Sequence, residues 1–220
     1  MIYENNKKLI PKLRFPEFQT AGEWEEKKLE ELITSFNTGL NPRNFFKLNT
    51  EDAKNYYITA KEIQNNSIIF NENTDKINNN ALMLCNNRSN LEVGDILFSG
   101  TGTIGKIYII KEQPNNWNIN ESIYAIKPNK EILKSDFLFY SLQSPYIKNM
   151  YSLKIKGSII QSLPIREMKN LNILLPTLPE QQKIASFLTS ADELIGAERR
   201  KLEALKKYKK GLMQKLFPNI

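Results

Sequence analysis

Histidine is absent from all 220 residues of the sequence. Its absence excludes Ser-His-Asp and Cys-His catalysis, and it excludes zinc sites that need an imidazole ligand. A pair of carboxylates or a lysine base remains formally open as a catalytic group. No compact cluster of Asp and Glu favours either one. The sequence therefore gives no positive sign of an enzyme.

Cysteine is almost as scarce, because Cys85 is the only one and no internal disulfide can form. No apolar run approaches the roughly 18 residues that span a bilayer. The opening segment, MIYENNKKLIPKLRF, lacks the apolar core of a secretory signal. These absences predict a cytoplasmic protein without a membrane partner.

Positive charge is in modest excess, with 31 Lys and Arg against 24 Asp and Glu and a net charge of +7. From Pro179 to the end the chain holds 9 basic and 5 acidic side chains, whereas the part before Pro179 holds 22 and 19. The balance indicates an anionic partner without identifying it. If the nearly neutral first part binds DNA, it does so through a local patch.

Glycine is sparse too, yet three of the 9 lie in LFSGTGTIGKIYII (97–110). Their spacing is that of the G-x-G-x-x-G fingerprint, and with Lys106 they spell most of a phosphate-binding loop. Both motifs present backbone N–H groups to phosphate at the start of a helix. Here residues 107–110 favour a strand, and Ile107 replaces the Ser or Thr that would bind magnesium. We therefore expect a turn between two strands, with a nucleotide-binding enzyme as the weaker alternative.

The segment 1–176 has the pattern of an α+β domain with a mixed or antiparallel sheet and flanking helices. Glu23–Ile33 has apolar residues near helical spacing, which predicts a short amphipathic helix with Trp24 in the core. Short β-branched and aromatic runs then alternate with Asn-rich clusters. The expected strands are Tyr56–Ile58, Ser67–Phe70, Asp95–Phe98, Lys106–Ile110 and Ser122–Ile126.

The Asn-rich clusters INNN, CNNRSN and PNNWNIN are typical of turns, although their amides could also read adenine edges. Ser135–Met150 returns to helical spacing, with Ser135 as a candidate cap. Residues 153–164 (LKIKGSIIQSLP) predict an exposed basic loop, and Met168–Leu175 predicts a last strand that Pro176 stops.

The final segment predicts one long helix that runs to Phe217, on the order of 55–60 Å. Thr177 and Glu180 have the spacing of a capping box, with Pro179 in the first turn. Ten positions then follow one another in steps of four and three, as in a coiled-coil seam, and all but Glu198 and Lys209 are apolar. The seam consists of Ile184, Leu188, Ala191, Ile195, Leu202, Leu205, Leu212 and Leu216. A helix this long cannot bury its whole stripe on so small a domain, so we expect another helix to cover part of it.

Basic residues cluster on the same predicted helix, at 199–201 and 206–210. They suit a solvated or protein-facing side of a coiled coil, because Lys and Arg are favoured in the C-terminal half of a helix. Contact with nucleic acid is the alternative.

Four segments together resemble the DNA-specificity subunit of type I restriction–modification systems, and they span nearly the whole chain. Three of them are PKLRFPEF with EWEEKKLEEL, GDILFSGTGTIGK, and DFLFYSLQS. The most specific is LPTLPEQQKIASFLTSADELI, which continues into RRKLEALKKYKKGLMQKLF.

The resemblance implies a subunit that carries two target-recognition domains, each followed by a long helix. The domains grip the two halves of a split DNA site, and the antiparallel helices set the spacing between them. Such a subunit performs no chemistry and carries no cofactor. It docks methyltransferase subunits that use S-adenosylmethionine, and the assembly can add a restriction subunit that hydrolyses ATP with Mg.

This chain contains one such unit: a recognition domain at 1–176, a helix at 177–217 and a tail at 218–220. We expect a homodimer that joins through the helix and reads an inverted repeat in double-stranded DNA. A piece of a full-length subunit, or a half that combines with a different half, remains open. So does an orphan or silent DNA-binding or coiled-coil protein without a methyltransferase.

Specific DNA binding needs cations for phosphates, and amides or guanidinium groups for base edges. Two basic, polar segments, CNNRSN and KIKGSIIQ, are the preferred places. The candidate DNA-binding residues are Arg43, Lys61, Asn86, Asn87, Arg88, Thr101, Thr103, Lys154, Lys156, Ser158 and Gln161.

Overall fold

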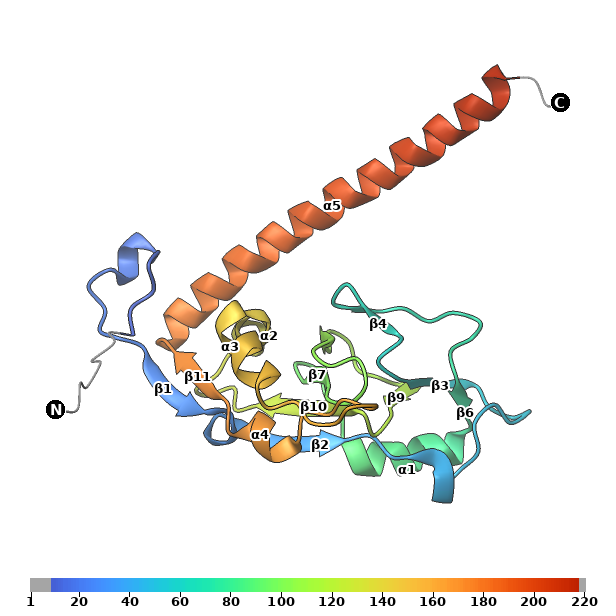
Figure 1. The fold of residues 1–220 in the computed structure, drawn as a ribbon, viewed down its shortest axis with the longest axis horizontal. Helices are drawn as coiled ribbons and strands as arrows, with labels where there is room; N and C mark the ends of the chain where they lie inside the picture. The colour runs from blue at the N-terminus through green and yellow to red at the C-terminus, as the bar shows by residue number, and fades with distance from the viewer. Residues whose placement is uncertain (1–8, 218–220) are drawn as a thin grey trace. The chain divides into compact units, whose positions relative to one another are not determined.

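The computed structural model describes residues 9–217 and divides into two compact units. The first unit ends at Gln182, and its described part contains the sheets and the short helices (Figure 1). The second begins at Lys183 and consists of the rest of α5 (Leu178–Leu216). Sheets, short helices and one long C-terminal helix confirm the predicted α+β class.

The largest sheet has four strands in the order β2-β10-β7-β8, and all its pairings are antiparallel. Its central strand β10 is buried at every residue except Lys127, which explains its almost continuous apolar sequence. The strands are β2 (Ile33–Thr38), β7 (Ile96–Ser99), β8 (Ile107–Ile109) and β10 (Ile123–Pro128).

Three smaller sheets complete the first unit. In one of them β3 pairs antiparallel with β6 and parallel with β9, so the sheets are mixed. The other two are the antiparallel pairs β1-β11 and β4-β5. The strands are β1 (Glu25–Lys28), β3 (Asn55–Ile58), β4 (Ile63–Gln64), β5 (Ser67–Ile68), β6 (Lys76–Ile77), β9 (Trp117–Ile119) and β11 (Asn172–Leu175). All five predicted strands exist, although the one expected at Ser67–Phe70 ends at Ile68.

The predicted helix at Glu23–Ile33 is wrong. Glu25–Lys28 forms β1, Leu29–Glu31 forms a 3₁₀ turn (η2), and β2 begins at Ile33. Pairing with β11, distant in the sequence, outweighs the local helical spacing. Trp24 is half-buried rather than fully in the core, and its ring packs edge-on against Phe137 at 6.2 Å.

The expected turn CNNRSN is also wrong, because most of it forms the end of α1 (Asn79–Ser89). Cys85 and Ser89 lie on the buried face of this helix, four positions apart. Asn residues act at its two ends instead. The Asn78 side chain accepts from the backbone N–H of Ala81 at 3.0 Å, and Asn90 adopts the left-handed conformation that ends the helix. The other two clusters also contain regular structure, since INNN runs into α1 and PNNWNIN includes β9.

The helix predicted at Ser135–Met150 consists of two helices, α2 (Ser135–Gln143) and α3 (Pro145–Ser152). Pro145 starts the second helix, and Ser144 caps it by accepting from the N–H of Ile147 at 3.3 Å. Lys134, not Ser135, is the N-cap of α2. The last predicted strand is shorter than expected, because Met168 belongs to α4 (Ile165–Lys169).

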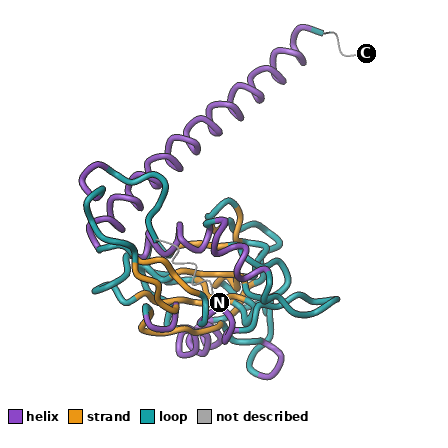
Figure 2. The backbone as a smooth tube through the Cα atoms, turned by 60° about the vertical axis from the view of Figure 1, so that its left-hand side comes forward, coloured by secondary structure: helices purple, strands orange, loops and turns teal. Residues whose placement is uncertain are grey.

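The long helix is confirmed as α5, which has 39 residues and a length of roughly 58 Å (Figure 2). Its first turn is fastened to the first unit. The Gln181 side chain donates to the carbonyls of Ile132 and Pro176 and accepts from the N–H of Lys134 at 2.9 Å. Over residues 9–217, no helix combines the length and the apolar composition needed to cross a membrane.

Candidate nucleic-acid interface

Residues 100–106, called here the glycine turn, connect β7 to β8. Ser99 donates its N–H to the Lys106 carbonyl at 2.9 Å, and Gly105 donates to the Ser99 carbonyl at 3.0 Å. Gly102 and Gly105 have φ values of +75° and +89°, the left-handed region that favours glycine. The predicted strand-to-strand turn is thus confirmed, and no helix begins after its last glycine to direct N–H groups at phosphate.

Lys106, the lysine of the apparent phosphate-binding loop, makes a structural contact. Its ammonium donates to the backbone carbonyl of Ala60 at 2.6 Å. This contact ties the turn before β4 to the glycine turn. The ammonium is therefore already engaged with the protein backbone.

The basic loop, residues 153–164, lies against the glycine turn although the two segments are distant in the chain. Lys156 and Ser162 exchange two backbone hydrogen bonds of 2.8 Å, which close the loop into a narrow hairpin. Gly102 donates to the carbonyl of Gln161, and the N–H of Leu163 donates to the carbonyl of Gly100, both at 2.8 Å. The two segments form one continuous surface, called here the composite surface.

Tyr124 of β10 helps to hold the basic loop against the glycine turn. Its hydroxyl donates to the carbonyl of Leu163, next to the hairpin. Burial raises the pKa of Tyr124 above that of a free tyrosine, so the hydroxyl stays protonated and able to donate further into the alkaline range. A Cβ added to Gly100 would lie 2.0 Å from the Tyr124 ring, so only glycine fits at that position.

We expect Gly100→Ala to destabilise the domain by about 1–3 kcal/mol or more, because the tyrosine ring has to move. Gly102→Ala meets no atom within 4 Å but forces a side chain onto a positive φ. It should cost about 1–2 kcal/mol. Urea denaturation of the two variants measures both effects. Equal stability of Gly100→Ala and the unmodified protein would contradict the close contact with Tyr124.

The composite surface is basic because its two segments contain no acid. Residues 153–164 hold two cations and no Asp or Glu, and residues 100–106 hold one cation and none. Lys154 meets Glu167 of α4 at 3.7 Å, with the lysine side chain 54% exposed. Such a loose pair leaves the ammonium available to an anion.

Six of the predicted DNA-binding residues meet on the composite surface: Thr101, Thr103, Lys154, Lys156, Ser158 and Gln161. All of them are exposed except Thr101, which is half-buried. Exposed Lys61 lies beside this surface, since it follows the carbonyl of Ala60 that Lys106 contacts.

The structure does not gather the other four predicted residues there. Asn86, Asn87 and Arg88 are on α1, which packs on β9 and β2 (Figure 1), and Arg43 is in η3 (Pro42–Asn44). The Asn86 side chain accepts from the amide of Asn118 at 2.8 Å, so it contributes to packing between α1 and β9.

Sequence reasoning missed two features of the composite surface. It gave Tyr124 no role, because a tyrosine inside a strand is indistinguishable from an ordinary core residue. It also assigned nothing to Ile159 and Ile160, which are 95% and 66% exposed on the hairpin. Two adjacent isoleucines inside a basic, polar loop were a visible signal.

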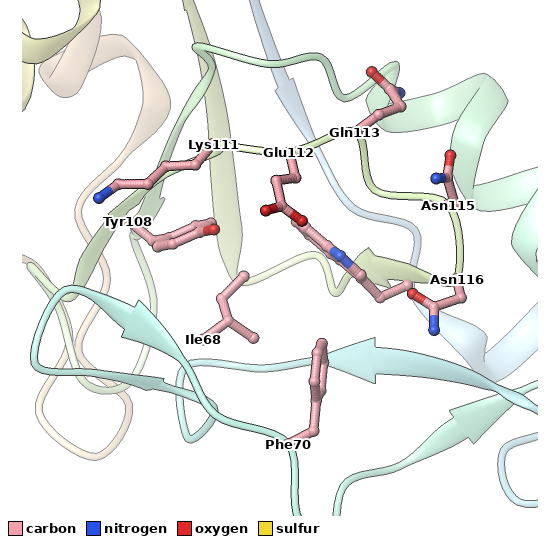
Figure 3. Close-up of a pocket in the computed structure, with 9 residues that line it drawn as sticks. Ile68, Phe70, Tyr108, Lys111, Glu112, Gln113, Asn115 and Asn116 are labelled. Atoms are coloured by element: carbon pink, nitrogen blue, oxygen red, sulfur yellow. The ribbon is translucent and has the colours of Figure 1, made fainter.

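A separate hollow of about 520 Å³ lies between β5, β8 and residues 111–117 (Figure 3). Ile68, Phe70 and Tyr108 form an apolar side, and the polar chain from Lys111 to Asn116 crosses above them. Glu112 on this rim offsets the charge of Lys111 beside it, so the hollow offers phosphate no net positive charge and suits a DNA backbone less well than the composite surface does.

Comparison with known proteins also points to DNA recognition. Residues 21–207 match the family described as the type I restriction modification DNA specificity domain. The type I restriction enzyme MjaVIII specificity subunit of Methanocaldococcus jannaschii is 29% identical over 227 residues, which cover 97% of this chain and 45% of that protein. A second protein of that organism, also named for a type I specificity subunit, is 30% identical over 202 residues, or 89% of this chain and 45% of its own.

Solved structures show the same fold. The type I restriction-modification S subunit from M. genitalium matches 94% of this chain and 48% of its own, with a TM-score of 0.62 and 20% identity. The HsdS subunit from Thermoanaerobacter tengcongensis matches 90% and 50%, with a TM-score of 0.57 and 18% identity. The chain spans about half the length of the relatives that it matches.

Proposed function

The chain belongs to the family of type I restriction modification DNA specificity domains, and from this premise we propose that it recognises DNA without catalysing a reaction. Its first unit reads one half of a bipartite double-stranded site, and the complete assembly acts at that site. The observation that carries the proposal is the composite surface, in which polar and cationic side chains from two acid-free segments converge.

The composite surface has the chemistry that recognition requires. Lys154 and Lys156 are exposed and positioned to contact phosphates, while Gln161 and Thr103 offer groups that hydrogen-bond to base edges. Backbone hydrogen bonds hold both segments before any ligand arrives. Such preorganisation lowers the ordering cost of binding.

Dimerisation through α5 is the second part of the proposal. Its seam residues from Ile195 onward remain open, with Leu202 at 52%, Leu205 at 56% and Leu216 at 73% exposure. An apolar stripe that recurs in heptads along a helix of this length matches the surface of a second identical helix. Two copies then present two identical domains to an inverted repeat.

The proposed role in DNA recognition implies further protein partners. We propose that the chain docks type I methyltransferase subunits, and that the assembly accepts a restriction subunit. S-adenosylmethionine would be bound by the first and ATP with Mg by the second, with no cofactor on this chain. The cytoplasm is the proposed location, where the DNA target is accessible.

Sequencing the methylated DNA of the host with and without the gene tests the proposal. Loss of adenine methylation at one bipartite palindromic motif is expected for a homodimeric specificity subunit. Loss at an asymmetric motif would support the recognition role but overturn the homodimer in favour of a different half-subunit. An unchanged methylation pattern would support the alternative, an orphan or silent DNA-binding protein.

Lys106→Ala separates the proposal from nucleotide binding. We expect the variant to fold and assemble, to lose about 1 kcal/mol of stability with its contact to Ala60, and to bind DNA at most modestly more weakly. Calorimetric titration of the unmodified chain with ATP should show no heat of binding. An intrinsic ATP-dependent activity that disappears in Lys106→Ala would contradict the structural role of the glycine turn.

A further inference from the structure

Two adjacent exposed apolar side chains of the composite surface lie at the end of its hairpin. Ile159 is 95% exposed and Ile160 is 66% exposed, and both fall between the bridging residues Lys156 and Ser162. Full exposure of one isoleucine forgoes about 1.5–3 kcal/mol that burial would provide. Two adjacent ones at the end of a polar loop therefore indicate a ligand that covers them.

The hairpin end is held rigidly rather than left as a loose loop. Two backbone hydrogen bonds close it at its base, and the carbonyl of Gln161 accepts from Gly102 of the glycine turn. Gly157 has φ +97°, and a Cβ there would lie 2.2 Å from the carbonyl oxygen of Ile160. The chain thus reverses tightly at 157–161, and the two isoleucines keep a fixed place beyond the lysines.

Charge identifies the class of ligand. Lys156 is at the base of the hairpin, Lys154 precedes it on the same side, and residues 153–164 contain no acid. A docking surface for a folded protein normally offers a contiguous apolar patch of roughly a few hundred Å². Two isoleucines flanked by cations instead suit a ligand with an anionic rim and apolar groups further in, as in a DNA groove.

The width of the hairpin favours one of the two DNA grooves. The paired arms of a hairpin are about 5 Å apart between backbones, before side chains are added. The major groove, about 12 Å wide, admits a two-stranded ribbon as it stands, whereas the minor groove, about 6 Å wide, has to be widened by deforming the DNA. The apolar group that the major groove offers is the C5-methyl of thymine.

We propose that the 157–161 hairpin enters the major groove and that Ile159 contacts the methyl group of a thymine in the recognised half-site. Lys154 and Lys156 contact the flanking phosphates and so set the depth of entry. The inference rests on the proposed DNA recognition and adds the base that one residue reads.

Deoxyuridine tests this contact, because it differs from thymidine only by that methyl group. Duplexes that carry the motif found by methylation mapping are prepared with each thymine in turn replaced by deoxyuridine. Binding of the full chain, together with its methyltransferase subunits, is then measured. We expect one position in each half-site at which the replacement weakens binding roughly three- to tenfold.

Variants of Ile159, measured on the same duplexes, complete the test of this contact. Ile159→Ser should weaken binding to the thymine duplex by a similar factor and should be insensitive to deoxyuridine at that position. Ile159→Val should retain most of the sensitivity, since it keeps branched methyl groups. Leu13→Ser is the matched control, because Leu13 is 89% exposed but lies outside the composite surface. It should behave like the unmodified chain.

Three results would overturn the inference while leaving DNA recognition intact. They are a half-site without thymine, equal sensitivity of the unmodified chain and Ile159→Ser to deoxyuridine, and normal DNA binding by Ile159→Ser with loss of the methyltransferase. The last would show that the tip faces a protein. Failure of the unmodified assembly to prefer its motif over unrelated DNA would instead refute the proposed function.

Discussion

Replacing Arg14 with alanine is expected to lower the melting temperature of the protein by on the order of 10 °C. The Arg14 guanidinium forms two parallel hydrogen bonds to Glu180, at 2.6 and 2.7 Å, where α5 begins. The side chains of this pair are only 7% and 1% exposed. Arg14 also donates to the carbonyls of Ala21 and Gly22, at 2.7 and 3.0 Å. Alanine removes all four contacts and leaves a buried carboxylate whose one remaining side-chain donor among residues 9–217 is Trp24, at 3.3 Å.

Variants of both residues separate the effect of the ion pair from the effect of the side-chain packing around it. Glu180→Gln should destabilise nearly as much as Arg14→Ala, because it leaves the guanidinium buried without a charge partner. Arg14→Met combined with Glu180→Leu should lie closer to the unmodified protein, since no charge stays unpaired. Lys206→Ala serves as the control, because its pair with Glu203 is exposed and should barely change the melting curve. A melting temperature of Arg14→Ala within about 2 °C of the unmodified protein would refute the clamp.

The outcome of the sequence predictions depended on whether local signals or distant pairing decide an element. The long helix and the strand-turn-strand around the glycines were predictable, because heptad spacing and a β-branched run are local signals. The segment at Glu25–Lys28 was not, because its strand state depends on pairing with β11, which lies near the other end of the first unit's sequence. The charged sequence of this segment contains no local signal of that pairing.

Asparagine caused the second error. The cluster at 85–90 suggested a turn by composition, yet Cys85 and Ser89 are spaced for one buried helix face. The four-residue step was present in the sequence, and the Asn count concealed it. Only the ends of the helix, Asn78 and Asn90, behave as the composition suggests.

The candidate site was half visible in the sequence. Its two segments were each recognisable as polar or glycine-rich, but nothing local reveals that Thr101 pairs with Ser162, which is far from it in the chain. That pairing depends on Tyr124 beneath both segments and on the missing side chain of Gly100. A surface assembled by such a contact emerges only when the fold is known.

Leu202→Asp or Leu205→Asp is expected to convert the protein from a dimer to a monomer. The two positions are a step of three apart on the seam, and each is more than half exposed along the single helix. In a paired coiled coil, either aspartate would be buried against a second apolar stripe without a cation to meet it. Light scattering should show the mass fall from twice the chain mass of 25.5 kDa to once that value.

Ala204→Asp is the matched control, because it adds the same residue within the same turn but away from the seam. It should remain a dimer, and circular dichroism should show equal helix content in all three variants. An unchanged mass in the two leucine variants would refute the seam, and a monomeric unmodified protein would refute the homodimer. The monomeric variants should still bind an isolated half-site through the intact composite surface. They should lose the added affinity for the full inverted repeat, since two domains act together only while the helices join them.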